Sequence, residues 1–395
     1  MPIPIAYRLL VFVLLTAAFS LQPLNAQEQE DESKFISNLK EFFTFYPNYR
    51  AVERDSTIYA QKFIVAPVVS YSPETNFGVG IGAKYLFKFN GSGEETRTSN
   101  MPITAQYTLN SQFFLFSGFE IFTNQEKWVI EGNLLFQNYP RIYYGRGSNA
   151  SESAEEQYDY TQFLFEPIFL KQMFAKHLFI GAGARYNRIY GVDTEEDGLI
   201  ESEALDGFDG STSFGIEAAS LFDSRDVILN ASKGWYVELT HGEYFEALGG
   251  TNEFNLTRID VRHFLEMSDK NHDVLGFQFL GRAVRGKQPF SEYSFFGSAE
   301  IMRGYQEGRF VDRDLMAAQV EYRKRFGDSR WGAVAFLGAG DVYRNIDEFQ
   351  FGNLKPNYGV GLRWMLDKSE NLNLRLDWGF GQGTNNLYLG IAEAF

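Results

Sequence analysis

The chain ends in Asn385-Asn-Leu-Tyr-Leu-Gly-Ile-Ala-Glu-Ala-Phe395, and this stretch decides the fold. Large apolar side chains (Leu387, Leu389, Ile391, Phe395) share one face with a single polar residue, Glu393, and Tyr388, Gly390, Ala392 and Ala394 share the other. A strand that crosses a membrane shows one face to hydrocarbon and the other to a lumen, and a closed barrel pairs all its backbone groups. The tail therefore predicts a transmembrane strand that runs to Phe395.

The preceding segment repeats this pattern with charges on one face. Leucine or an aromatic residue occupies every second position from Leu372 to Phe380, and the intervening positions are Asn373, Arg375, Asp377 and Gly379. Charges at every second residue of a spanning strand are tolerated only when they face a wet lumen. This segment therefore predicts a barrel strand with a polar inner face.

Sixteen such segments follow one another from Lys62 to the C-terminus. We expect strands over 62–71, 77–89, 101–109, 112–122, 127–144, 158–171, 177–190, 211–223, 234–245, 253–266, 272–285, 314–326, 330–343, 357–366, 371–380 and 385–395. Short connections such as 327–329 alternate with long polar ones such as 191–210 and 286–313, as periplasmic turns and extracellular loops do. The sequence predicts an all-β, sixteen-stranded antiparallel transmembrane β-barrel over 62–395. Pro167 lies within the expected strand 158–171 and would remove a ladder hydrogen bond, which predicts either a bulge or a misplaced strand boundary there.

The N-terminal residues 1–26 resemble a secretory signal peptide. Arg8 precedes an apolar run from Leu9 to Leu21, and Leu24-Asn25-Ala26 offers a cleavage site. Residues 27–61 open with acidic residues and then place apolar side chains at helical spacing, with Ser33 as a cap and Pro47 after the end. We expect a short periplasmic segment that is either an amphipathic helix, in the lumen or on the inner leaflet, or a partly ordered tether.

Composition narrows the class of protein further. The chain has no cysteine, which excludes disulfides, thiol catalysis, cysteine-based zinc sites and a lipoprotein anchor. A net charge of −15 makes nucleic acid a poor partner. No segment after the signal approaches the ~20 continuous apolar residues of a spanning helix. A large soluble β-sandwich or propeller is the alternative, but no blade repeat is evident.

Four segments, in order along the chain, resemble the barrel half of the BamA/TamA superfamily of outer-membrane insertases, once called bacterial surface antigens. They are Phe222-Asp-Ser-Arg-Asp226 with Lys233-Gly-Trp235, Ile301-Met-Arg-Gly-Tyr305, Phe336-Leu-Gly-Ala-Gly-Asp-Val-Tyr343, and the tail from Tyr358-Gly-Val-Gly-Leu-Arg-Trp364 through Leu374-Arg-Leu-Asp-Trp378. The resemblance is strongest over 211–395. It implies a barrel whose long loop folds back into the lumen.

The resemblance also implies a lock between this loop and the inner wall. Arg303, within the Arg303-Gly304-Tyr305 motif, matches the family's loop arginine, and Glu321 matches one carboxylate partner. Gly338 stands where the family's second acidic partner is usual, and Asp341 is its candidate replacement. A planar guanidinium in a narrow lumen needs carboxylate partners in any case.

The family resemblance implies a role in inserting or assembling outer-membrane proteins or lipids, in the outer membrane of a Gram-negative bacterium. Family insertases carry periplasmic POTRA repeats, but the 35 residues of 27–61 are too few for one, so we expect a POTRA-less barrel with a separate envelope or assembly-complex partner. We place the mechanism at a seam between the first strand, which contains Pro67, and the last strand, which ends at Phe395. This seam would open laterally, and its exposed strand edge would template an incoming strand. The alternative is a passive pore or a structural subunit of an outer-membrane complex.

No constellation of side chains predicts an enzyme. His241 and Glu243 share a strand face without a serine partner, and the acidic loop 193–209 lacks the ligand spacing of a calcium loop. We therefore expect no catalytic residue, no cofactor and no metal, and outer-membrane lipids as the surroundings of the barrel.

Overall fold

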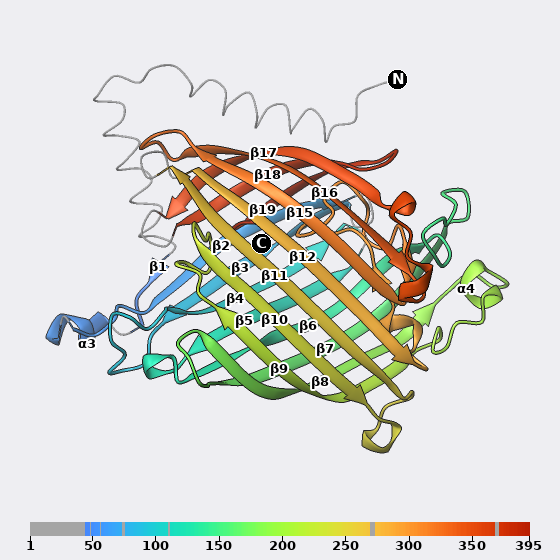
Figure 1. Ribbon diagram of the computed structural model, residues 1–395, viewed down its shortest axis with the longest axis horizontal. Helices are drawn as coiled ribbons and strands as arrows, with labels where there is room; N and C mark the ends of the chain where they lie inside the picture. The colour runs from blue at the N-terminus through green and yellow to red at the C-terminus, as the bar shows by residue number, and fades with distance from the viewer. Residues whose placement is uncertain are drawn as a thin grey trace.

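The computed structural model describes residues 44–47, 49–55, 57–72, 76–109, 111–268, 273–367 and 371–395. Sixteen long strands make up most of these residues (Figure 1). They are β2 (Lys62–Ser72), β3 (Asn76–Phe87), β4 (Ser99–Thr108), β5 (Phe113–Phe122), β6 (Trp128–Tyr143), β7 (Glu156–Gln172), β8 (Leu178–Asp193), β9 (Ser211–Asp223), β10 (Gly234–Tyr244), β11 (Phe254–Ser268), β12 (Asp273–Gly286), β15 (Asp314–Arg325), β16 (Trp331–Tyr343), β17 (Lys355–Asp367), β18 (Leu372–Phe380) and β19 (Asn385–Ile391).

The other elements are short. They are β1 (Thr44–Phe45), β13 (Ser294–Phe295), β14 (Val311–Asp312), the helices α3 (Tyr49–Arg54) and α4 (Leu199–Ser202), and the single turns η1 (Asn124–Glu126), η2 (Glu246–Leu248), η3 (Phe290–Glu292), η4 (Ile346–Glu348) and η5 (Phe351–Asn353). In the described part of the chain, none of the helices has the length and apolar character needed to cross a membrane.

Each long strand is antiparallel to the next one along the chain, and the sheet curls until β19 lies beside β2 (Figure 1). The chain thus forms the sixteen-stranded antiparallel barrel that the alternating pattern predicts. Connections 144–155, 194–210, 287–313 and 344–354 lie at one end, which we call the loop end. Connections such as 123–127 and 326–330 lie at the other, which we call the turn end.

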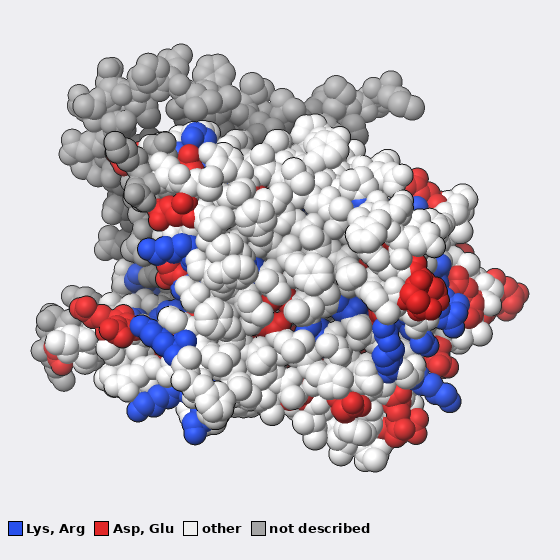
Figure 2. Space-filling model, viewed as in Figure 1, with Lys and Arg blue, Asp and Glu red and all other residues white. Residues whose placement is uncertain are grey.

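The outer surface of the barrel is apolar between two charged rims. Figure 2 shows Lys, Arg, Asp and Glu gathered at the two ends, with few in the band between. Exposed apolar side chains fill this band, among them Val79, Ile81, Phe169, Ile216, Leu239, Leu337, Val360, Leu362 and Leu389. The period of two in the sequence therefore separates an apolar outside from an inner face of different character.

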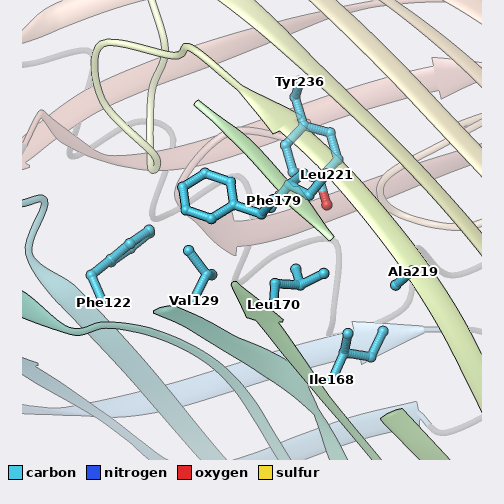
Figure 3. Close-up of a cluster of buried hydrophobic side chains, with 8 residues drawn as sticks. All are labelled: Phe122, Val129, Ile168, Leu170, Phe179, Ala219, Leu221 and Tyr236. Atoms are coloured by element: carbon cyan, nitrogen blue, oxygen red, sulfur yellow. The ribbon is translucent and has the colours of Figure 1, made fainter. Parts of the chain in front are cut away.

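The inner face is apolar near the turn end. Eight inward side chains from β5 to β10 form one buried cluster (Figure 3): Phe122, Val129, Ile168, Leu170, Phe179, Ala219, Leu221 and Tyr236. Toward the middle of the barrel the inner residues become charged, with Glu166, Arg185, Glu217 and Arg258 linked by ion pairs. The lumen is thus filled by apolar side chains of the wall at the turn end and is lined by ion pairs at its centre.

All sixteen predicted strands exist, and their ends differ by a few residues. The largest error is at the C-terminus, where β19 stops at Ile391 instead of continuing to Phe395. Ala392 has φ +77°, a left-handed backbone that cannot continue a strand. The bulge predicted at Pro167 is also absent: β7 pairs Pro167 with Gly132 of β6, and its register with β8 is the same on both sides of this residue.

The predicted signal peptide (1–26) lies outside the described residues, as does most of the predicted helix that would begin near Ser33. The described end of that helix differs from the prediction, because Thr44 and Phe45 form the strand β1. The described helix of this segment, α3, begins only at Tyr49.

Candidate functional site: the loop anchors and the seam

Arg303, at the tip of the connection 287–313, reaches the inner wall of the barrel. Its Nη2 lies 2.5 Å from Glu321 Oε2 of β15 and its Nη1 lies 2.6 Å from Asp377 Oδ2 of β18, with all three side chains fully buried. The guanidinium carbon stacks 3.6 Å from the ring centroid of Phe336. Burial acts to lower the pKa of Arg303, but the two carboxylates outweigh it and raise this pKa. The long loop therefore folds into the lumen and is held there by a two-carboxylate contact.

Gly304 allows the loop tip to come this close to the wall. Its φ is +112°, and a β-carbon there would lie 2.5 Å from the carbonyl carbon of Phe380 in β18. A β-carbon on Gly379 would likewise lie 2.7 Å from the carbonyl carbon of Arg303. Asn357 of β17 donates to the Arg303 carbonyl at 2.9 Å. The Arg-Gly pair thus combines a charge with a backbone that only glycine permits.

Tyr305 connects the same loop tip to the last strands. Its hydroxyl donates to the Pro356 carbonyl at 2.8 Å and accepts from the backbone N–H of Gln382 at 2.9 Å. In β19, the Tyr388 hydroxyl accepts from the N–H of Gly304 at 2.9 Å and donates to the Tyr305 carbonyl at 3.2 Å. The inward loop is therefore bound to the strand that forms one side of the seam.

The second carboxylate at Arg303 comes from Asp377 and not from Asp341. Asp341 instead accepts a hydrogen bond of 2.5 Å from Ser148 and lies 3.6 Å from Lys355 Nζ, in a different part of the loop end. At Gly338, where the family's acidic residue is usual, a β-carbon would lie 2.7 Å from a backbone oxygen. The alternation of β18 places Asp377 on the inner face, so the sequence already showed that its carboxylate faces the lumen.

The carboxylates around Arg303 are shared with arginines of the wall. Glu321 accepts from Arg323 Nε at 2.8 Å, and Asp377 accepts from Arg363 Nη1 at 2.5 Å. Arg363 Nε in turn donates to Glu393 at 2.7 Å. This chain of ion pairs runs from the loop tip to the C-terminal tail, so the loop and the tail belong to one network.

A second anchor, of opposite charge, lies at Glu292 in η3. This loop carboxylate is fully buried and accepts hydrogen bonds of 2.8 Å from Arg185 Nη1 and from Asn187, both on β8. Arg282 of β12 donates to the Glu292 carbonyl at 2.7 Å, and its Nη2 lies 3.4 Å from the carboxylate. Burial acts to raise the pKa of Glu292, but Arg185 and Arg282 outweigh it and lower this pKa. Sequence reasoning missed this anchor.

At the seam, β2 and β19 meet differently from the other strands. The fifteen other neighbouring pairs each have a residue-by-residue register, whereas within the described residues 62–72 and 385–391 none is defined, and these strands approach each other only over a short stretch. β2 spans 11 residues and β19 spans 7. Pro67 lies in the middle of β2 opposite Ile81 of β3, with its side chain exposed. The predicted seam residue Pro67 is thus on the first strand of the seam.

Phe395 does not lie on the seam strand. After Ala392 the tail turns into the barrel, where the ring of Phe395 stacks on Phe264 of β11 at a centroid distance of 6.1 Å. A main-chain oxygen of Phe395 accepts from Arg323 Nη2 at 2.8 Å. The sequence placed Glu393 on the outer apolar face; it is instead buried and bonded to Arg363. The tail therefore packs against the inner wall, because its polar groups find partners there.

The short strand β1 lies along the edge of β2 that faces the seam, at the place where the C-terminal tail has turned away into the barrel. It pairs antiparallel with the start of β2, Thr44 opposite Ile64 and Phe45 opposite Phe63. The other edge of these β2 residues already pairs with β3. β1 therefore lies on the seam side of β2, at the turn end.

The aspartate-rich motif after β9 builds the turn end of the lumen. Asp223 is fully buried and accepts from Arg225 Nε at 2.9 Å and from Arg97 Nη1. Arg97 comes from the long connection between β3 and β4, and its Nε donates to Glu126 at 3.0 Å. Through these hydrogen bonds, the motif links the connection after β9 to the connection between β3 and β4 and to the one between β5 and β6, at the turn end of the barrel. In the part of the chain that the structure describes, no group of three or more His, Cys, Asp or Glu side chains is arranged to hold a metal ion.

A family model described as the Omp85 superfamily domain matches residues 79–395. The chain belongs to the Omp85 superfamily. The match covers most of β3 and all strands from β4 to β19, including both loop anchors and the last strand. The family resemblance that the four motifs indicate is thereby confirmed. A search of curated proteins gives no match.

Two solved structures share the fold of this Omp85 barrel. One is BamA from Haemophilus ducreyi lacking POTRA domains 1–3, with a TM-score of 0.52 and 11% identity, covering 84% of this chain and 69% of that one. The other is CdiB from Acinetobacter baumannii, with a TM-score of 0.52 and 10% identity, covering 84% of this chain and 59% of that one. At these identities the likeness shows the fold alone.

Proposed function

We propose that this Omp85 barrel lies in the outer membrane of a Gram-negative bacterium and assists the insertion or assembly of outer-membrane proteins or lipids through the seam between β2 and β19. The observation that carries this proposal is the unequal seam. The last strand is four residues shorter than the first, and its tail is turned inward. Strand edges pair readily with incoming chains.

The contacts of the loop tip give the seam a means of control. Tyr388 of β19 holds the backbone of Gly304 and Tyr305, and Arg303 holds β15 and β18 from the same turn. A movement of β19 away from β2 would therefore disturb the loop tip. We propose an envelope or assembly-complex protein as the partner of this barrel.

A disulfide staple across the seam tests this proposal. The chain has no cysteine, so cysteines introduced at Ile64, Val65 or Val68 and at Leu387, Leu389 or Ile391 meet no background thiols. Several pairs are needed until one crosslinks, which requires a Cα separation near ~5.5–6 Å. The matched control is Leu376→Cys with Leu389→Cys, which staples Cα partners of β18 and β19 without crossing the seam.

We expect the seam-stapled protein to fold, because β2 and β19 already approach each other in the barrel, and yet to fail in supporting outer-membrane assembly in cells that depend on it. Reduction should restore function, and the β18–β19 control should work in both redox states. A fully stapled protein that works as well as the reduced one excludes lateral opening, and the alternative of a passive pore or structural subunit then replaces it.

A further inference from the structure

A cleft at the loop end contains two buried cations. It encloses about 730 Å³ between four connections and is lined, among others, by Ser148, Glu152, Arg309, Phe310, Lys355 and Tyr358. Arg309 and Lys355 are 7% and 6% exposed. Both cations sit on one ring: the Arg309 guanidinium carbon lies 4.4 Å and Lys355 Nζ 4.8 Å from the centroid of Phe310.

The two cations differ in how many hydrogen-bond acceptors they have. Lys355 Nζ donates to Ser148 Oγ and to the Asn353 carbonyl, each at 2.7 Å, and lies 3.6 Å from Asp341. Arg309 Nε and Nη1 are buried and have no hydrogen-bond acceptor within the described residues.

Its Nη2 is 3.7 Å from Glu152 Oε1, which is beyond hydrogen-bond distance, and the Glu152 side chain is 64% exposed. Buried donors are nearly always paired, so this arginine requires an explanation.

Arg309 is also held in place without hydrogen bonds from its guanidinium. The group stacks on Tyr144 at 4.8 Å as well as on Phe310, and the Tyr144 hydroxyl is fixed by Gln306 at 3.1 Å. Aromatic faces orient a guanidinium without using the N–H groups in its plane, and two of these nitrogens in Arg309 are buried without an acceptor. The unpaired Nε and Nη1 lie on different edges of the guanidinium, and each forms a planar fork with Nη2, which can bind two oxygens of a carboxylate or phosphate at once.

We propose that this cleft is a binding site for an oxyanion, of the phosphate class, on the loop-end side of the barrel. Arg309 supplies the directed hydrogen bonds and Lys355 adds positive charge beside the same ring. Glu152 lines the cleft and competes with the ligand for Arg309, and Asp341 lies 3.6 Å from Lys355 Nζ. Tyr358, which also lines the cleft, points outward from β17 and is 61% exposed. The cleft therefore extends to the outer, apolar surface, where the phosphate of a lipid headgroup can enter; free phosphate shares the same chemistry. This site goes beyond the proposed role of the seam.

Binding to the full-length barrel in detergent micelles tests the proposal by calorimetry. Three probes separate the sources: inorganic phosphate, a short-chain phosphatidic acid, and the matching diacylglycerol without phosphate. Arg309→Gln should weaken binding of the phosphorylated probe at least tenfold. Arg188→Gln is the matched control, because Arg188 also stacks on a tyrosine ring, at 5.2 Å from Tyr190, but does not line the cleft.

Glu152→Gln keeps the test decisive if Arg309→Gln disturbs folding, since Glu152 is an exposed loop residue whose loss should tighten binding severalfold. Binding of phosphatidic acid alone identifies a headgroup site, and equal binding of inorganic phosphate identifies a free-anion site; both support the proposal. Equal binding of the diacylglycerol, or affinities that neither the Arg309 nor the Glu152 substitution changes, would overturn it.

Discussion

Arg303 Nη2 lies 2.5 Å from Glu321 Oε2, and neither side chain is exposed to solvent. The pair joins the tip of the longest loop to the middle of β15, and Asp377 completes it from β18. An arginine buried this deeply needs both carboxylates, because an unpaired charge in such a site is very unfavourable. The loop is thus held in the lumen by a directional contact as well as by apolar packing.

Replacing Arg303 with glutamine should free the loop. The change leaves Glu321 and Asp377 without their loop partner, and breaking one side of a buried pair typically costs ~3–5 kcal/mol. We expect faster proteolysis within 287–313 and a lower midpoint of urea unfolding in micelles. The control is Lys176→Gln, whose ion pair with Glu95 is exposed and 4.0 Å long and should contribute almost nothing. Wild-type proteolysis in Arg303→Gln would exclude the anchor.

A charge swap between Arg303 and Glu321 should not rescue the anchor. An arginine at position 321 would meet Arg323, whose Nε now lies 2.8 Å from Glu321. A glutamate at position 303 would face Asp377. Both new contacts are repulsive, so the double variant should unfold at lower urea than Arg303→Gln alone. Recovery of the wild-type midpoint would show that Arg303 and Glu321 act as an isolated pair.

The second anchor should contribute independently. Glu292→Gln keeps the shape of the side chain but removes the charge that faces Arg185 and Arg282. We expect a lower unfolding midpoint and increased proteolysis near η3, with Arg303 still in place. Glu307→Gln is the control, because Glu307 is 50% exposed and its ion pair with Arg141 is partly solvated. If the two substitutions have the same effect, the charge of Glu292 is not an anchor.

Much of the fold was predictable because its signal is local. The period of two is visible within each strand, so the sixteen strands could be placed without knowing their neighbours. Arg303 and Glu321 could be named from motifs that resemble those of a family. Asp377 was visible as an inward charge of β18, but its partner depends on where the loop tip lies.

The remaining features depend on contacts between distant residues. Glu292 and Arg185 are 107 positions apart, and nothing in either segment indicates the other. Phe395 continues the alternation of β19 in the sequence, yet Ala392 leaves the strand and the ring packs on Phe264. A period of two cannot show where a chain stops being a strand, because the inward partners of the tail come from other strands.

The packed tail should contribute to stability. Phe395 is 8% exposed, and its ring also lies 5.3 Å from the guanidinium carbon of Arg323. Phe395→Ala should lower the free energy of unfolding by ~3–5 kcal/mol, as for other buried phenylalanines. Phe351→Ala serves as the control because Phe351 is 83% exposed in a loop. Equal unfolding midpoints for the two variants would show that the tail is not packed in solution.

The position of β1 can be tested by crosslinking. Phe45→Cys with Phe63→Cys joins Cα partners of β1 and β2, which should lie within disulfide reach. Phe45→Cys with Tyr85→Cys is the control, since Tyr85 pairs with Phe63 from the other edge and is therefore about 10 Å from β1. Oxidation should crosslink the first pair only. Crosslinking of both pairs at similar rates would indicate that the segment does not pair with β2.

Conductance distinguishes a loop-filled barrel from an open pore. The connection 287–313 fills the loop end of the lumen through a buried cluster that includes Phe296, Met302 and Tyr305. The wild-type protein should therefore give no steady channels in planar bilayers. Replacing residues 294–311 with a short Gly-Ser linker keeps β12 and β15 and should produce steady openings, and the double variant Arg303→Gln, Glu292→Gln should produce brief ones. Heat-modifiable migration in gels checks that each variant is folded. Suppose instead that the wild-type protein gives steady channels and that the deletion does not increase their conductance. The loop would then not plug the lumen, and the passive-pore alternative would be favoured over a mechanism at the seam.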